Sequence, residues 1–243
     1  MPTIIVNDPL ATLRNCGGYY ECPKEPDGKR LGPLVGYAGK YGLDGEHFVG
    51  DVYYNFARAE QYPAVRDHFA RQMENRFPFS GVDVFLGSPM GGILLAGDLG
   101  RVTSGTRVIF AEKKIISLAN GGQREESILV IDRHEIWPGD LVVIVEDVCN
   151  NFSTTDQLIR LVEELGGKVI EVVCFLNRSP HDVVPGVGVI IRVLSLLHIE
   201  TVQYQQDNPA VVDDIQAGNV VWKPKRDWER LSAAMKAAEP QPI

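Results

Sequence analysis

VVIVEDVCNNFSTTDQL, residues 142–158, is the stretch that decides the fold of this chain. Four apolar residues run directly into two adjacent carboxylates, Glu146 and Asp147, and a polar loop then leads into a helical pattern. A short apolar run followed by a helix is typical of a parallel strand that helices cover. Adjacent carboxylates after a buried strand lose hydration and repel each other unless a cation or hydroxyl donors satisfy them. This pair therefore indicates a binding site.

The same alternation of strand and helix recurs on both sides of this stretch. Apolar runs predict strands at 82–87, 106–113, 141–147, 169–177 and 187–196, and helical spacing predicts helices at 57–76, 91–102, 153–165, 207–217 and 225–237. We therefore expect an α/β fold with a central parallel sheet and helices on both faces. Residues 1–50 are rich in Gly, Pro and Tyr and predict irregular structure with short strands.

Composition limits the classes of function. The 243 residues carry a formal net charge of -8, which argues against general binding of nucleic acid or of an anionic membrane. No apolar run approaches the roughly 20 residues that span a bilayer, and the N-terminus lacks a secretory pattern. Four scattered cysteines predict free thiols in a reduced, cytoplasmic protein, although Cys16 and Cys22 could form a disulfide or half of a metal site.

Polar residues follow four of the predicted strands. They are Gly87–Gly92, Glu112–Lys114, Glu146–Asp147 and Asn177–Ser179. Ligands of an open parallel sheet bind at the carboxyl ends of its strands, so we expect these groups to converge on one cleft. Glycines, lysines, paired acids and an arginine suit a polyanion attached to a sugar. Taken singly, the glycine turn could merely join strand to helix and the lysines could be solvated.

Three segments in order resemble type I phosphoribosyltransferases, and most of all orotate phosphoribosyltransferases. They are FLGSPMGGILLAGDLGRV (85–102), VIFAEKK (108–114) and RHEIWPGDLVVIVEDV (133–148). The similarity spans about residues 82–178, and HFVGDVYYNFARAEQYP (47–63) resembles the family's base-binding segment more weakly. The resemblance implies an N-terminal hood and base-binding region at 1–80, an α/β core at 81–200 that binds phosphoribosyl pyrophosphate (PRPP), and a C-terminal helical extension at 201–243.

The family's reaction gives each group an expected role. A base nitrogen displaces pyrophosphate from PRPP, Mg²⁺ is held mainly by PRPP, and the enzyme is commonly a homodimer of pyrimidine biosynthesis. By resemblance, Glu146 and Asp147 bind the ribose hydroxyls, and Lys113 acts with them in catalysis. The expected pyrophosphate contacts are Ser88, Pro89, Met90, Gly91, Gly92, Lys113, Lys114 and Arg133. The expected base contacts are Lys40, Tyr54, Asn55 and Arg178. The hairpin 114–138 would be a lid, with Arg124 as a further anion contact and Trp137 capping its closed form.

The phosphate loop departs from the family's pattern. Where the family has Thr-Thr-Gly-Gly-Ser-Thr, this chain has Asn150, Asn151, Phe152, Ser153, Thr154 and Thr155. Glycine lets the backbone approach the 5-phosphate, and we expect that Phe152 cannot replace it without rearrangement. We still expect residues 150–155 to bind the 5-phosphate, through the hydroxyls of Ser153, Thr154 and Thr155 and the helix N-terminus, while Asn150 and Asn151 preserve part of the turn. Ser153 and Asp156 resemble a capping box. The sequence thus predicts a transferase acting on orotate or a related pyrimidine, or alternatively a non-catalytic relative that binds PRPP or a nucleotide as a sensor or regulatory partner. An unrelated nucleotide-binding module would need a Walker-type lysine, which is absent.

Overall fold

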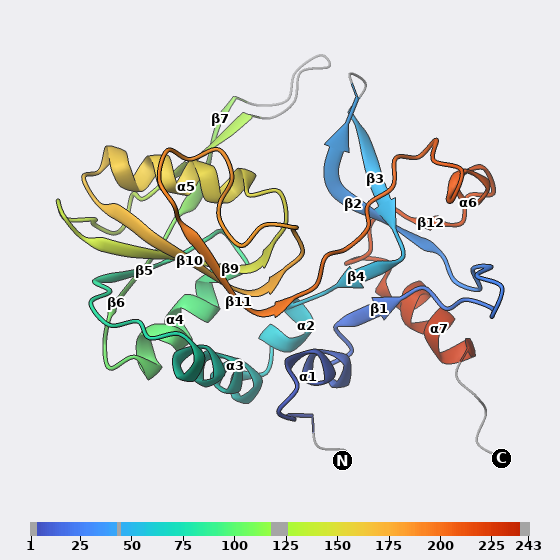
Figure 1. Ribbon diagram of the computed structural model, residues 1–243, viewed down its shortest axis with the longest axis horizontal. Coiled ribbons are helices and arrows are strands. Elements are labelled where there is room, and N and C mark those ends of the chain that lie inside the picture. The colour runs from blue at the N-terminus through green and yellow to red at the C-terminus, as the bar shows by residue number, and fades with distance from the viewer. Residues whose placement is uncertain (1–3, 43–44, 118–125, 239–243) are drawn as a thin grey trace. The chain divides into compact units, whose positions relative to one another are not determined.

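The computed structural model describes residues 4–42, 45–117 and 126–238 of the chain (Figure 1). By its internal contacts the chain divides into two compact units. The first unit comprises residues 60–200 and the segment that ends at Thr12, and the second comprises residues 13–59 and the segment that starts at Thr201. All the residues expected to bind the phosphates, ribose and pyrophosphate of PRPP lie in the first unit.

A five-stranded sheet forms the centre of the first unit, in the order β11-β10-β9-β5-β6 with every neighbouring pair parallel. Its strands are β5 (Val84–Gly87), β6 (Arg107–Phe110), β9 (Leu141–Cys149), β10 (Lys168–Asn177) and β11 (Arg192–His198). Gly87, the last residue of β5, lies opposite Val145 of β9. The loop that follows β5 therefore begins beside the acidic pair at the end of β9.

Helices cover both faces of this sheet, as the sequence predicts. Figure 1 shows α5 (Ser153–Glu164) on one face and α3 (Pro63–Arg76) and α4 (Gly92–Val102) on the other. Because β9 is covered on both sides, all four residues 142–145 are fully buried. The α5 face forms one cluster of buried side chains that includes Ile144, Leu158 and Val162. On the opposite face the rings of Phe69 and Phe175 pack 4.6 Å apart. The α/β fold class is confirmed.

Two predicted strands differ from those observed. The strand expected at 106–113 is wrong in extent, because β6 ends at Phe110 and Glu112 begins β7 (Glu112–Ser117). β7 pairs antiparallel with β8 (Glu126–Val130) and forms a hairpin outside the central sheet. The strand expected at 187–196 starts later, at Arg192, because the apolar residues Val189 and Ile190 are exposed rather than buried in the sheet.

The second unit is built from short strands and two of the helices. β1 (Tyr19–Glu21) pairs antiparallel with β4 (Val52–Tyr54), and a three-stranded sheet has the order β12-β2-β3. The bounds of the latter are β12 (Val220–Val221), β2 (Leu34–Tyr41) and β3 (Glu46–Gly50). The remaining elements of the chain are α1 (Pro9–Asn15), α2 (Ala57–Glu60), α6 (Val212–Gln216) and α7 (Trp228–Ala238). The C-terminal segment thus adds a strand to a sheet begun near the N-terminus.

In the part of the chain that the structure describes, no helix combines the length and the apolar character needed to cross a membrane. All four cysteines are free and buried, so the alternative of a disulfide between Cys16 and Cys22 is not formed.

Candidate functional site

The acidic pair lies at the carboxyl end of β9 in two different environments. Glu146 is 7% exposed, whereas Asp147 is partly exposed and accepts a hydrogen bond from the backbone N–H of Val148 at 2.8 Å. Burial raises the pKa of Glu146 to about 8, a hydrogen bond from the Ser88 hydroxyl opposes this shift, and the negative charge of Asp147 adds to it. A buried carboxyl group whose pKa is raised beside a second carboxyl group is typical of an active site.

The loop from Ser88 to Gly92 lies directly against this strand end. The backbone N–H of Ser88 donates to the carbonyl oxygen of Val145 at 2.9 Å. A Cβ atom on Gly91 would lie 2.3 Å from the Asp147 carboxylate, and one on Gly92 would lie 1.9 Å from the Val145 oxygen. Position 92 therefore requires glycine, because the atom that a Cβ would meet is backbone, whereas a side chain at position 91 would have to displace the Asp147 carboxylate.

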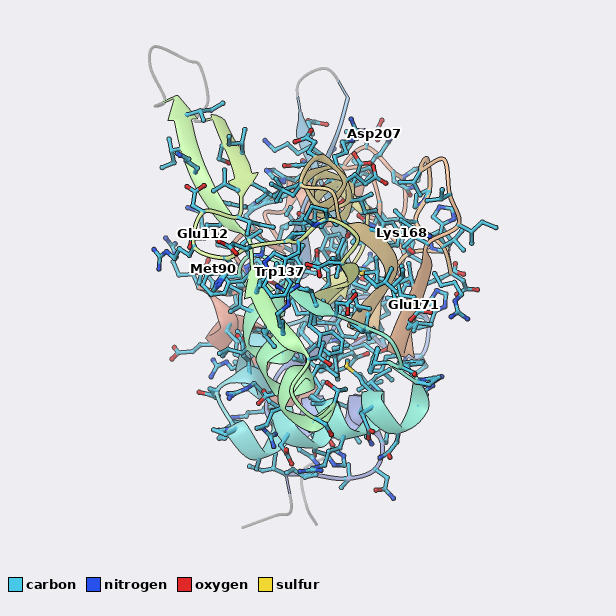
Figure 2. The ribbon with its side chains drawn as sticks, turned by 90° about the vertical axis from the view of Figure 1, so that its left-hand side faces the viewer. Met90, Glu112, Trp137, Lys168, Glu171 and Asp207 are labelled. Atoms are coloured by element: carbon cyan, nitrogen blue, oxygen red, sulfur yellow. The ribbon has the colours of Figure 1, made fainter. Side chains whose placement is uncertain are left out.

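The middle of this loop is turned outward. The peptide bond between Pro89 and Met90 is cis, and the Met90 side chain is 82% exposed. Figure 2 shows Met90, Glu112 and Trp137 on the side of the molecule that faces the viewer, where the β7–β8 hairpin leaves the sheet. The pyrophosphate role assigned to residues 88–92 stays a prediction.

The phosphate loop keeps a glycine-like turn without a glycine. Phe152 has φ 56° and ψ 11°, which is the left-handed conformation that glycine favours, and it immediately precedes α5. Its side chain is only 5% exposed and belongs to the cluster of buried residues under α5. Phe152 therefore makes the turn that glycine favours, with its ring in the core, and the expected effect of this residue on phosphate contact stays a prediction.

The start of α5 differs from the predicted capping box. The residue preceding the helix is Phe152, which makes no side-chain cap, and Ser153 is the first helical residue. The side-chain oxygen of Asn151 accepts hydrogen bonds from the Ser153 N–H at 3.2 Å and from its hydroxyl at 3.0 Å. Asp156 forms an ion pair with Arg160 at 3.0 Å. Since Asn151 supplies the local acceptor, the capping box is not needed, and the negative charge of Asp156 is paired.

The basic residues expected to contact pyrophosphate lie on the hairpin and at its base. Lys113 is an exposed residue of β7, and Lys114 forms an ion pair with Asp132 at 3.4 Å. Arg133 pairs with Glu112 at 2.8 Å, and its side chain is 71% exposed. Arg124 lies outside the described residues. The hairpin thus carries cations next to the strand ends, and their roles as anion contacts stay predictions.

Trp137 has a structural environment that the sequence does not reveal. The guanidinium of Arg107 stacks over its ring at 3.8 Å and also forms an ion pair with Asp140 at 2.5 Å. Asp140 in turn accepts the Trp137 backbone N–H at 2.6 Å. These contacts hold Trp137 in the turn before β9, which makes it part of the scaffold that fixes the acidic strand.

A rigid turn after β10 holds Arg178 under the phosphate loop. The backbone N–H of Arg178 donates to the carbonyl oxygen of Cys149 at 2.9 Å, and the side chain is 8% exposed. Asn177 accepts hydrogen bonds from the Ser179 N–H at 3.0 Å and from its hydroxyl at 2.8 Å, and donates to the His181 oxygen at 2.8 Å. An Asn-x-Ser pattern after a strand is the sequence signal for such a turn.

The other three expected base contacts belong to the second unit. Lys40 is exposed in β2, and the ring of Tyr54 packs against Tyr19 with centroids 5.4 Å apart. The backbone N–H of Asn55 donates to the carbonyl oxygen of Gly18 at 2.7 Å. Their assignment to the base is a prediction that rests on the resemblance alone.

Comparison with known proteins agrees with this arrangement. The family model for the phosphoribosyl transferase domain matches residues 59–207, which include the whole central sheet and the loops at its strand ends. The chain belongs to the phosphoribosyltransferase family. The family resemblance seen in the sequence is thereby confirmed.

Several similar phosphoribosyltransferases are named orotate phosphoribosyltransferase. One, from Caldanaerobacter subterraneus subsp. tengcongensis, is 32% identical over 163 residues, which are 67% of this chain and 77% of that relative. One from a Thermoanaerobacter species is 31% identical over the same shares of the two chains. A third, from Desulforamulus reducens, is 30% identical over 66% of this chain and 76% of its own.

Proposed function

We propose that this phosphoribosyltransferase transfers the ribose 5-phosphate group of PRPP to a pyrimidine base, orotate, and releases pyrophosphate. The observation that carries this proposal is the packing of Glu146 and Asp147 against the loop from Ser88 to Gly92 at the end of β9. The three curated relatives named orotate phosphoribosyltransferase support the choice of base. The bond between the anomeric carbon and the pyrophosphate oxygen breaks, and a bond from that carbon to the base nitrogen forms.

The side chains of the cluster suit a reaction in which positive charge develops on the ribose ring. Glu146 and Asp147 would accept hydrogen bonds from the 2′- and 3′-hydroxyls, and their negative charge would stabilise that developing charge. The backbone N–H groups of the glycine turn would hold the leaving pyrophosphate, together with Lys113 and Arg133. Exclusion of water would fall to the β7–β8 hairpin, because a ribosyl cation exposed to water hydrolyses.

This set of residues fits Mg²⁺ that enters the site bound to PRPP. Mg²⁺ prefers oxygen ligands and commonly binds through substrate phosphates, where it offsets the charge of pyrophosphate. The two carboxyl groups at the end of β9 give the strand end a negative field in which PRPP with its cation binds better than PRPP alone. In this proposal the ion is held mainly by oxygens of PRPP.

The turn at Phe152 favours a catalytic protein over a non-catalytic sensor. The altered phosphate loop is the sequence feature that suggests the non-catalytic alternative, yet the backbone at Phe152 has a left-handed turn and α5 starts directly after it. The first-turn N–H groups of Ser153, Thr154 and Thr155 lie at the positive end of the helix dipole, which favours a phosphate. Asn150 and Asn151 complete the proposed cradle. Arg178, buried at the end of β10, would supply a cation for the carboxylate of orotate.

The proposal includes the setting in which the enzyme works. As the resemblance implies, we place it in pyrimidine biosynthesis, in the cytoplasm, as a homodimer. Light scattering coupled to size-exclusion chromatography tests the oligomeric state directly, and a mass near twice 26.9 kDa is the expected result.

A direct assay tests the function. The purified protein is incubated with PRPP, Mg²⁺ and orotate while the loss of orotate absorbance is followed, with uracil and the purine bases tested in parallel. We expect turnover of orotate, and loss of that turnover in the Glu146→Gln/Asp147→Asn double variant. Binding of PRPP by calorimetry without turnover of any base would favour the sensor instead, and neither binding nor turnover would refute both.

A further inference from the structure

The loop from Ser88 to Gly92 is expected to bind pyrophosphate through backbone N–H groups, but Ser88 also makes a contact with its side chain. Its hydroxyl donates to the Glu146 carboxyl group in a buried hydrogen bond that joins residues 58 positions apart in the sequence. Ser88 is 1% exposed, and its own backbone N–H is bound to the carbonyl oxygen of Val145, the residue before Glu146. Side chain and main chain of one serine therefore attach the loop to the same strand end.

We propose that Ser88 is a positioning residue, whose hydroxyl holds the Glu146 carboxyl group at the pyrophosphate loop and favours the ionised, hydrogen-bond-accepting form of that group. This inference rests on the proposed function for its consequence in catalysis. The hydrogen bond between Ser88 and Glu146 is present in the protein without substrate, so it can be tested separately from catalysis.

The loop has little freedom to release this contact. The Cβ position of Gly92 lies 3.2 Å from the Ser88 hydroxyl oxygen and 1.9 Å from the carbonyl oxygen of Val145, so the start of α4 is packed closely on both. The backbone N–H of Gly92 also donates to the Ser88 carbonyl oxygen at 3.1 Å. These contacts fix where the hydroxyl points, and so they fix the carboxyl oxygen that it binds.

The other groups around Glu146 disfavour its charge. Asp147 is negative and adjacent, and both burial and Asp147 raise the pKa of Glu146. Across the sheet Glu146 lies opposite Cys174 of β10, and Cys149 follows three residues later on β9. The side-chain hydrogen bond with Cys174 and burial raise the pKa of Cys149 well above its ordinary value, so this thiol stays neutral and does not offset the negative charge of Glu146. Ser88 is the contact that lowers the pKa of Glu146.

Removing the hydroxyl should therefore act through Glu146. A hydrogen bond to a charged group contributes about 1.5–3 kcal/mol, so we expect Ser88→Ala to lower kcat/KM for PRPP about tenfold to a hundredfold near neutral pH. The acidic limb of kcat/KM, which reports the free enzyme, should move to higher pH by about one unit or more. Thr103→Val, which removes a hydroxyl bonded to the Leu99 carbonyl oxygen at the other end of α4, should leave the limb in place.

A double-mutant cycle separates positioning from a general structural effect. In a Glu146→Gln background the side chain no longer titrates, so Ser88→Ala should reduce kcat/KM by less than about twofold there. An equal loss in both backgrounds would overturn the proposal. Ser88→Thr retains the hydroxyl and should keep the acidic limb at the wild-type position.

A titration without substrate decides the inference even if no base is turned over. Protein labelled with ¹³C at the glutamate carboxyl carbons is titrated by NMR, and Glu146 is assigned by the signal that Glu146→Gln removes. We expect a raised midpoint in the wild-type protein and a still higher one in Ser88→Ala. The same midpoint in both proteins would refute the role of Ser88, whereas a shift without turnover would uphold it and refute only the proposed transferase.

Discussion

Phe152 combines an unfavourable backbone conformation with a favourable side-chain position, and two substitutions can separate them. Its φ of 56° lies where an L side chain costs about 1–2 kcal/mol per residue. Its ring is 5% exposed and lies in the same buried cluster as Leu158 and Ile159. Alanine removes the ring and keeps the backbone cost, whereas glycine removes both.

The magnitudes give the opposite order of stability from the one found in a helix interior. Deleting a buried phenylalanine ring costs about 3–5 kcal/mol, so Phe152→Ala should lower the free energy of unfolding by about that amount. Phe152→Gly loses the same ring but recovers about 1–2 kcal/mol of backbone energy, for a net loss of about 1–4 kcal/mol. The glycine variant should therefore be more stable than the alanine variant by about 1–2 kcal/mol, although glycine in a helix interior is the less stable of the two.

Equilibrium unfolding in urea measures this difference. The three proteins are compared by their denaturation midpoints, and equal slopes against urea concentration show that the unfolded states are comparable. An alanine variant as stable as the glycine variant would contradict the reasoning, because it would mean that the left-handed turn costs nothing at this position.

Three further predictions concern the strand-end cluster. Gly92→Ala should abolish most PRPP turnover and lower the thermal midpoint, because its Cβ would meet the Val145 oxygen at 1.9 Å. Gly97→Ala is the control, since position 97 is on the exposed side of the same helix and a Cβ there has nothing within 4 Å. This variant should keep turnover and stabilise the protein by up to about 1 kcal/mol. The pKa of Glu146 is raised from 4.5 to about 8, so between these pH values the side chain is protonated in the folded protein and ionised in the unfolded chain. The free energy of unfolding therefore falls as pH rises through that window. Urea unfolding at pH 5 and pH 9 should show Glu146→Gln gaining stability over wild type at the higher pH, and an equal difference at both would contradict the shift. Arg133→Ala should change the free energy of unfolding by less than about 1 kcal/mol, because its ion pair is exposed, yet raise KM for PRPP; a normal KM would remove it from the proposed site.

The central sheet could be predicted from sequence because its strands are buried on both faces. Residues 142–145 are all fully buried, and such strands read as continuous apolar runs that end abruptly at polar residues. Because strand ends of one parallel sheet share an edge, the acids near the end of β9 and the glycines after β5 could be placed together from the sequence. The contact between Gly91 and Asp147 agrees with that inference.

The β7–β8 hairpin could not be predicted in the same way. Ile115 and Ile116 are 51% and 55% exposed, so apolar character there does not indicate burial in the sheet. The strand is defined instead by its partner, because Lys113 lies opposite Leu129 and Lys114 opposite Ile128. Strand pairing depends on the sequences of both partner strands, and the pattern within residues 106–113 contains only one of the two.

The hydroxyl bond from Ser88 to Glu146 was missed for a related reason. Local patterns describe residues a few positions apart, and this contact joins residues 58 positions apart. The adjacent carboxylates signalled that some donor must be present, since buried charge without one is costly. Which donor it is depends on how β5 and β9 pair, with Gly87 opposite Val145, and that register places Ser88, the residue after β5, beside Glu146.

Phe152 shows why residue identity and backbone conformation must be considered separately. Read as a motif, the loop has lost the glycine that permits a positive φ, and the sequence predicts phosphate binding only through the hydroxyls and the helix N-terminus that follow. Burial of the ring contributes about 3–5 kcal/mol, which exceeds the 1–2 kcal/mol that the left-handed conformation costs. Tertiary packing therefore sets the backbone here, and it does so at the residue that immediately precedes α5. A phosphate is bound by N–H groups whose direction depends on that backbone, so a change of residue that preserves φ can preserve the cradle.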